Sequence, residues 1–277
     1  VDLLGPHLGP AADRHDEAVA EALGIGRGRV EGLVGEAADY EVTGTSFAPD
    51  GAILRNGRTM TSLNQPGSAI HALAQTCAVC NDAKVIVDAH GRHKALGQAT
   101  EAALQVLVEK IGFHDAIRQA HLPDLLPALR AGAVCEMYTS SLPRLSTMDF
   151  TRDRKMMSTF VRRTEHDARL LVKGAAESVL LRSSHVFLND SEQRPLTDDM
   201  RAALHEKINT YANAGLRVLA IAVRDGMTPP DPLLPLDASM YGHYEQNLSL
   251  VGLVGMRDPP RPEVVQAIRS CMEAGVR

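Results

Sequence analysis

The sequence contains no tryptophan, and only 4% of its 277 residues are aromatic. Hydrophobic residues nevertheless make up 44% of the chain, so aliphatic side chains must supply most of the core. An aromatic side chain beside a cluster of charged residues therefore needs an explanation. The length favours one large domain with an appendage.

Long apolar runs, a secretion signal and a basic surplus are also missing. No stretch approaches the roughly 20 apolar residues of a membrane helix, and the first ten residues do not resemble a signal peptide. We therefore expect no direct membrane insertion of this fragment. The net charge of −5 argues against a nucleic-acid partner, because such proteins normally carry a broad basic surface.

Four cysteines are too few for a disulfide framework in a chain of this length, so reduced cytosolic thiols are expected. Cys77 and Cys80 have the CxxC spacing but lie in a helical pattern without a second ligand pair, which favours core packing over a zinc or redox site. We predict no metal site. The chain also lacks HExxH, a serine elbow and a complete phosphate loop.

Short β-branched runs alternate irregularly with helical patterns. This mixture predicts an α+β fold with a largely antiparallel twisted sheet flanked by helices. Helices are expected over residues 68–80, 99–111 and 198–214. Strands are expected over residues 40–43, 156–161, 168–172, 216–223 and 248–254.

The two ends of the chain differ from its middle. Residues 1–40 are interpreted as an insertion with one short helix over 13–23, followed by a flexible glycine-rich loop at 24–28. Near the other end, a proline-rich segment predicts a stiff connector, and Pro262 opens a helix that runs to Gly275. The expected domains are 41–257 and a truncated second domain that begins within 258–277.

Phe150 lies in a locally basic stretch. Residues 144–173 contain eight Lys or Arg against four Asp or Glu. Cationic groups bind phosphate, and an aromatic face can stack on a base, so this combination suits a mononucleotide site. The alternative is a solvated strand edge with Phe150 in the core. Lys173 and Gly174 add a weaker signal, because a glycine allows close ligand approach and a lysine supplies a point charge.

Seven segments, taken in order, resemble the nucleotide-binding domain of P-type ATPases, most closely the sarcoplasmic/endoplasmic-reticulum calcium-pump branch. The resemblance covers roughly residues 40–277, and the FTRDRK form favours calcium pumps over sodium/potassium pumps. The matching segments are VTGTSFAP (42–49), CAVCND (77–82), GQATEAAL (97–104), FTRDRKMM (150–157), VKGAAE (172–177), GLRVLA (215–220) and GLVGMRDPPR (252–261).

The resemblance implies a role for each matching residue. Phe150 would stack on adenine, Glu101 would bind its amino edge beside Thr100, and Lys173 with Gly174 would line the pocket. The phosphates would face Arg152, Lys155 and Arg217, between apolar walls from Met157 and Leu219. The hinge to the phosphorylation domain, whose first helix would end this chain, would be Asp258, Pro259, Pro260 and Arg261.

The resemblance further implies ATP and Mg²⁺ as cofactors, with the magnesium ligands mostly outside this chain. The parent would be a multi-pass calcium-transporting ATPase with this domain on the cytosolic face of a membrane, namely the endoplasmic reticulum. Its partners would be the phosphorylation, actuator and membrane domains of the same parent, and the fragment would be monomeric. Because the DKTGT motif with its acceptor aspartate is absent, the fragment should bind ATP without hydrolysing it.

Two positions depart from the family pattern. Gln98 replaces the usual acid three residues before Glu101, and Ala176 replaces the usual proline after Lys-Gly-Ala. Two other functions are alternatives to this one. A dehalogenase-type phosphohydrolase would need a DxDxT/V nucleophile motif, which is absent. A non-catalytic interaction module would use the basic stretch to dock an acidic partner, and it would bind polyphosphates without regard to the base.

Overall fold

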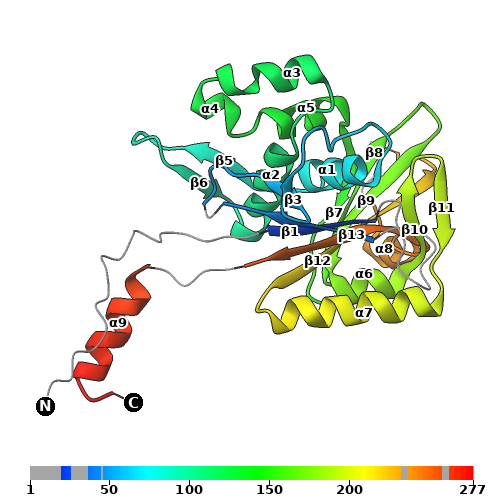
Figure 1. Cartoon of the computed structure of the whole chain (residues 1–277). Helices are drawn as coiled ribbons and strands as arrows, with labels where there is room; N and C mark the ends of the chain where they lie inside the picture. Colours follow the sequence, from blue (N-terminus) through cyan, green and yellow to red (C-terminus); the bar gives the residue numbers. More distant parts are fainter. Residues whose placement is uncertain (1–19, 26–36, 45, 232–235, 258–261, 277) are drawn as a thin grey trace, which may run out of the picture.

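The computed structural model describes residues 20–25, 37–44, 46–231, 236–257 and 262–276. Within them, eleven strands form one sheet and two more form a separate hairpin. The main path of the sheet runs β4-β3-β2-β1-β13-β12-β9-β8-β7 and is antiparallel throughout (Figure 1). Off this path, β10 pairs in parallel with β13 and in antiparallel fashion with β11.

The strands of the sheet are β1 (Ala20–Ile25), β2 (Ala37–Val42), β3 (Ile53–Arg55), β4 (Arg58–Thr59), β7 (Arg144–Met148), β8 (Met156–Arg162), β9 (Ala168–Ala175), β10 (Ser183–Asn189), β11 (Glu192–Pro195), β12 (Arg217–Met227) and β13 (Leu248–Met256). The hairpin consists of β5 (Lys84–Val87) and β6 (His93–Leu96). The helices are α1 (Ala69–Val79), α2 (Ala99–Ile111), α3 (Ala116–His121), α4 (Pro127–Arg130), α5 (Ala133–Ser141), α6 (Ala176–Arg182), α7 (Asp198–Asn213), α8 (Tyr241–Tyr244) and α9 (Pro262–Glu273), with 3-10 turns η1 (Leu122–Asp124) and η2 (Ala238–Met240).

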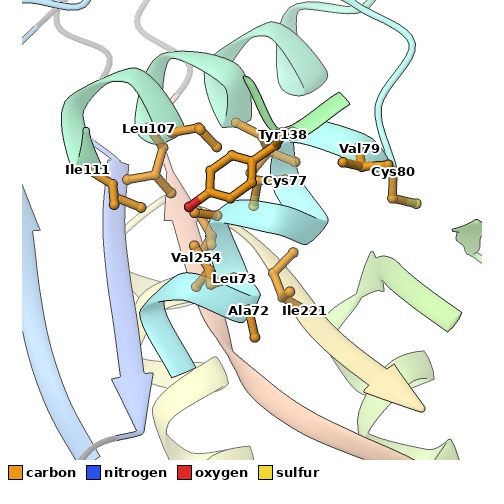
Figure 2. Packing of buried hydrophobic residues seen from close by; sticks show 14 of the residues in the cluster. Ala72, Leu73, Cys77, Val79, Cys80, Leu107, Ile111, Tyr138, Ile221 and Val254 are labelled. Atoms are coloured by element: carbon orange, nitrogen blue, oxygen red, sulfur yellow. The ribbon is translucent and has the colours of Figure 1, made fainter. Parts of the chain in front are cut away.

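Helices cover both faces of the sheet, with α1, α2 and α5 on one side and α6 and α7 on the other (Figure 1). Buried apolar side chains form a cluster on each face of the sheet. The first cluster lies on the side of α1, α2 and α5, and Figure 2 shows it with helical side chains such as Leu73 and Tyr138 packed toward Val254 of the sheet. The second cluster includes Leu180 and Leu253. Since adjacent residues of a strand point to opposite faces, β13 is buried along its whole length between the two clusters.

The helix ends follow from local sequence. Ser68 accepts a hydrogen bond from the His71 amide at the start of α1, and Thr197 does the same for Met200 at the start of α7. Gly112 ends α2 with φ +80°, in the left-handed region that a glycine adopts without strain. The α+β class, the antiparallel sheet and the expected helices and strands of residues 40–257 are confirmed.

The predicted helix over 13–23 is wrong where the structure describes it. Residues 20–25 form β1, which pairs with β2 on one side and β13 on the other, so Gly24 and Ile25 also lie in a strand instead of a loop. Strand pairing on both sides outweighed the local helical preference. Residue 40 lies within β2, and the division of domains there stays a prediction.

At the other end, residues 262–273 form α9, as expected. The four proposed hinge residues, Asp258, Pro259, Pro260 and Arg261, lie outside the described residues. None of the helices that the structure describes is both long enough and apolar enough to cross a bilayer.

Candidate functional site

Three neighbouring strands bring four of the ten proposed nucleotide residues, Met157, Lys173, Arg217 and Leu219, onto one face of the sheet. Lys173 of β9 stands opposite Met157 of β8 and opposite Ile221 of β12. Leu219 stands opposite Ala175, and Arg217 precedes it by two positions. Because opposed residues and residues two apart share a face, these side chains lie on the side covered by α1 and α2.

Glu101, in the first turn of α2, reaches this face and forms an ion pair with Lys173. The side chain of Lys173 is only 7% exposed and that of Glu101 17% exposed. Such a pair is only partly screened by water. A carboxylate in the first turn of a helix is also favoured by the helix dipole. Glu101 and Lys173 therefore form a mostly buried ion pair, which is the least exposed polar contact of the candidate site.

Thr100, which precedes Glu101 in α2, joins the candidate site to the start of β12. The Arg217 guanidinium donates a hydrogen bond of 2.7 Å to Thr100 Oγ1, at an exposed position. Leu219 is partly buried against the first cluster, and Met157 lies within it. Thr100, Glu101, Lys173 and Arg217 are thus brought together by direct polar contacts, above an apolar floor.

Residues 149–155 form the loop between β7 and β8, which we call the 149–155 loop. Its end is tied to β9, because Lys155 accepts a hydrogen bond from the Ala175 amide at 2.9 Å. Gly174 is required there. A Cβ at this position would come within 2.6 Å of Lys155 O and of Met156 Cβ. Lys155 itself has φ +55°, a left-handed conformation in which a non-glycine residue is strained.

Phe150 is exposed on this loop, with 57% of its surface accessible. Arg152 and Lys155 are exposed beside it. The alternative that placed Phe150 in the core is therefore wrong. A large apolar ring left in water is unexpected in a chain so short of aromatic residues, and it is available to a planar ligand.

Most of the basic stretch is neutralised within the molecule. Five of its eight cationic residues have carboxylate partners. The pairs are Arg144 with Asp82 (2.7 Å), Arg154 with Glu245 (2.5 Å), Arg163 with Asp225 (2.9 Å), Arg169 with Asp225 (2.6 Å) and Asp190 (2.7 Å), and Lys173 with Glu101. Much of the positive charge that the sequence indicated is therefore balanced by carboxylates of the same chain, although Arg152, Lys155 and Arg162 are exposed.

The CxxC cysteines lie beneath the site, and the prediction that they pack in the core is confirmed. Cys77 and Cys80 are buried free thiols in the first cluster. Burial raises the pKa of Cys77 to about 12 and raises that of Cys80, although the nearby Lys173 cation opposes both shifts. The thiols therefore stay protonated at neutral pH. The described residues contain no group of three or more His, Cys, Asp or Glu placed to hold a metal ion.

Two supporting residues escaped the sequence analysis. Asn81 donates hydrogen bonds to the carbonyls of Cys77 (2.9 Å) and Glu101 (2.8 Å), which fixes the start of α2 against the end of α1. Arg144 in turn donates to the Asn81 carbonyl. The sequence placed Asn81 just after the predicted helix, in the CAVCND segment, but it could not indicate which carbonyl groups Asn81 would bind.

Comparison with known proteins identifies the family of this chain. The family model of the P-type ATPase, cytoplasmic domain N, matches residues 69–263. The chain therefore belongs to this family, and the resemblance inferred from its seven segments is confirmed.

The curated relatives are calcium pumps of the endoplasmic reticulum. The chain is 41% identical over 243 residues to "Endoplasmic reticulum calcium ATPase srcA" of Aspergillus fumigatus, covering 86% of this chain and 25% of that protein. It is 36% identical over 253 residues to "Calcium-transporting ATPase 2, endoplasmic reticulum-type" of Arabidopsis thaliana, covering 86% and 23%. Its identity to "Calcium-transporting ATPase 4, endoplasmic reticulum-type" of the same plant is 35% over 254 residues, covering 88% and 23%. The chain thus spans about a quarter of the length of these relatives.

Proposed function

We propose that this domain binds ATP for a calcium-transporting P-type ATPase of the endoplasmic reticulum. Family membership and the names of the relatives support the class of the parent protein. The observation that carries the proposal for this chain is the exposed ring of Phe150, on a loop whose end is bonded to β9 beside Lys173 and Gly174.

In this proposal the base and the phosphates bind at different parts of the site. Adenine stacks on Phe150, and its exocyclic amino group donates a hydrogen bond to the Glu101 carboxylate, which can only accept when ionised. Lys173 and Gly174 line the pocket, with Met157 and Leu219 as its apolar walls. The phosphates face the exposed groups of Arg152, Lys155 and Arg217, with Thr100 at the rim.

Magnesium is proposed to arrive on the phosphates of the nucleotide. The described residues offer cations at the phosphate end and no cluster of carboxylates that could hold a metal ion, so we assign no magnesium ligand to this chain. Phosphoryl transfer needs an acceptor and acidic magnesium ligands. We assign both to the phosphorylation domain of the parent.

The rest of the parent protein completes the proposal. Residues 258–261 would act as the hinge, and α9 would open the phosphorylation domain. Closure about this hinge would carry the γ-phosphate to an acceptor aspartate outside this chain. Actuator and membrane domains of the same parent would couple the step to ion movement, with this domain on the cytosolic face of the membrane.

The main alternative, a basic module for an acidic partner, is less well supported. Docking by charge needs cations that are free to face the partner. Five of the eight cationic residues in the stretch are paired with carboxylates of the same chain, including Glu245, which is fully buried against Arg154. Membership of the P-type ATPase family also supports nucleotide binding over this alternative.

Isothermal titration of the 277-residue chain with ATP tests the proposal, with inorganic triphosphate as the matched ligand that lacks a base. We expect saturable binding that prefers ATP, because only ATP can use the ring of Phe150 and the carboxylate of Glu101. Equal binding of the two ligands would favour the interaction module, and no binding of either would refute the assignment of this site.

A further inference from the structure

Glu245, directly after α8, is an acid with no exposed side-chain surface. Its two polar contacts both involve Oε1, which accepts hydrogen bonds of 2.5 Å from Arg154 Nη1 and from Ser158 Oγ. Its other oxygen, Oε2, is the one buried side-chain polar atom of the described residues without a hydrogen-bond partner. Burial raises the pKa of Glu245, against the opposing effects of Ser158 and Arg154. The side chain of Glu245 is thus fully buried, although one of its two carboxylate oxygens has no hydrogen-bond partner.

The partner of Glu245 belongs to the 149–155 loop that presents Phe150. The Arg154 guanidinium also donates to the Asp149 carbonyl, so one side chain bridges the start of the loop and the buried acid. The same guanidinium lies over the ring of Tyr241, 4.9 Å from its centre. Arg154 therefore contacts both Tyr241 and Glu245, which belong to the segment made of α8 and the residue after it (residues 241–245, here called the α8 segment). Along the chain, Arg154 lies between Phe150 and the start of β8.

The α8 segment is itself fixed to the sheet. Arg224 of β12 donates hydrogen bonds to the carbonyls of His243 at 3.1 Å and Tyr244 at 2.9 Å. The ring of Tyr244 packs edge-on against Phe160 of β8. These contacts tie the α8 segment to β12 and β8. Glu245 therefore links the 149–155 loop, through Arg154, to a segment that is itself attached to the sheet.

We propose that Glu245 is a positioning residue for nucleotide binding, which holds the 149–155 loop through Arg154 so that Phe150 and Arg152 face the nucleotide in a fixed arrangement. This inference rests on the proposed function. A buried ion pair is seldom better for stability than apolar packing, so its value here lies in the geometry it imposes. A loop that is ordered before binding does not lose that freedom when the ligand binds.

A fluorescent reporter can test the anchor without any nucleotide. Since the chain has no tryptophan, Phe150→Trp places a single indole on the loop. In the Phe150→Trp chain, Glu245→Gln keeps the shape of the side chain but removes its charge. We expect lower tryptophan anisotropy in the double variant at 25 °C, because the loop moves more freely once Arg154 is released.

Titration with ATP then measures the effect of Glu245 on binding, in a chain that keeps phenylalanine at position 150. We expect Glu245→Gln to weaken ATP binding about tenfold, and Glu245→Asp to recover part of this loss because it restores the charge. Asp225→Asn is the matched control, since Asp225 is another carboxylate paired with arginines, namely Arg163 and Arg169. It should lower the melting temperature and leave ATP affinity within about twofold of wild type.

The outcomes separate the two proposals. Unchanged anisotropy and ATP affinity in folded Glu245→Gln would overturn the positioning role, as would an equal loss of affinity in Asp225→Asn. If Glu245→Gln does not fold, Tyr241→Leu removes the ring under Arg154 and should show a smaller change in the same direction; no change there would also overturn the role. If the wild-type chain does not bind ATP, the proposed function fails together with the effect of Glu245 on affinity, while the anisotropy still decides whether the acid anchors the loop.

Discussion

Individual residues of the candidate site are held by contacts within the protein. Glu101 pairs with Lys173, and Thr100 accepts a hydrogen bond from Arg217. A nucleotide that binds here must exchange some of these contacts for its own, so the net gain from each polar group is modest. Phe150 is different, because its ring is exposed and stacking costs it no existing contact of comparable strength.

Phe150→Ala should therefore weaken ATP binding by about 1–3 kcal/mol, which is the typical cost of losing one stacked base. The loss should be much smaller for inorganic triphosphate, and the melting temperature should change little because the ring is exposed. Phe113→Ala, at a half-buried ring of the first cluster, is the control that should lower stability without changing affinity. Wild-type ATP affinity in Phe150→Ala would remove the stacking assignment.

His71 is expected to make stability depend on pH. Burial, followed by the charge of His114, lowers its pKa from 6.5 to about 4. Its Nδ1 is hydrogen-bonded to Asn64 Oδ1 at 2.9 Å and its Nε2 to the Gln75 amide at 3.0 Å, an arrangement that suits the neutral ring. In the unfolded chain the ring binds a proton below pH 6.5, whereas in the folded chain it does so only below about pH 4.

The free energy of unfolding should consequently fall as the pH is lowered from 6.5 toward 4, because the unfolded chain binds more protons in that window. The contribution of His71 should be about 1–2 kcal/mol, reduced from the full linkage by partial exposure. Urea unfolding across this range measures it. His71→Gln should flatten the slope and exposed His90→Gln should not; the same slope in all three proteins would contradict the prediction.

At the scale of elements, α6 has a weak start. It begins at Ala176, and its N-cap, Ala175, makes no side-chain capping hydrogen bond. The Ala175 dihedrals, φ −56° and ψ +134°, suit a residue that precedes proline. The first helical position also tolerates proline, since its N–H has no partner within the helix.

Ala176→Pro should therefore stabilise the domain by about 0.4–1 kcal/mol, because proline restricts the unfolded chain at a position whose native conformation it already fits. This corresponds to a rise in melting temperature of about 1–4 °C for a domain of this size. Thermal unfolding followed by circular dichroism measures the change. Ala175→Pro is the control that should destabilise, because the Ala175 amide donates to the Lys155 carbonyl. A lower melting temperature in Ala176→Pro would mean that the buried site has no space for the ring.

The elements also differ in how well the sequence predicted them. The sequence predicted α1, α2 and α7 correctly because each has an apolar period and a recognisable end, such as Ser68, Thr197 or Gly112. It failed for β1, whose pairing partners β2 and β13 lie 12 and more than 200 residues away along the chain. No local pattern can report a partner so distant, and the residues of β1 have no strong β-branched run of their own.

For the whole molecule, the sheet separates two apolar clusters and β13 belongs to both. The candidate site lies on the side of the first cluster, and its proposed residues come from β8, β9, β12, the 149–155 loop and α2. A ligand that binds there contacts segments far apart in sequence. It should therefore stabilise the folded domain as a whole against the unfolded chain.

At an ATP concentration about 100-fold above the dissociation constant, mass action should stabilise the domain by about 2.7 kcal/mol. The melting temperature should then rise by about 5–10 °C. Differential scanning fluorimetry over a series of ATP concentrations measures the rise, and inorganic triphosphate should produce a smaller one. Equal shifts with both ligands would show that the base contributes nothing to binding.

The sequence by itself determined the class of fold and the family, and it supplied the residues proposed for the candidate site, because periodicity, end signals and seven ordered segments are all local properties of the chain. Only the tertiary structure decided which of those residues meet. It placed Lys173 against Glu101 and left Phe150 in solvent. It also paired five of the eight cations of the basic stretch with carboxylates up to 91 residues distant, as in Arg154 with Glu245. Charge can be counted from a sequence, but its pairing depends on which strands and loops lie side by side.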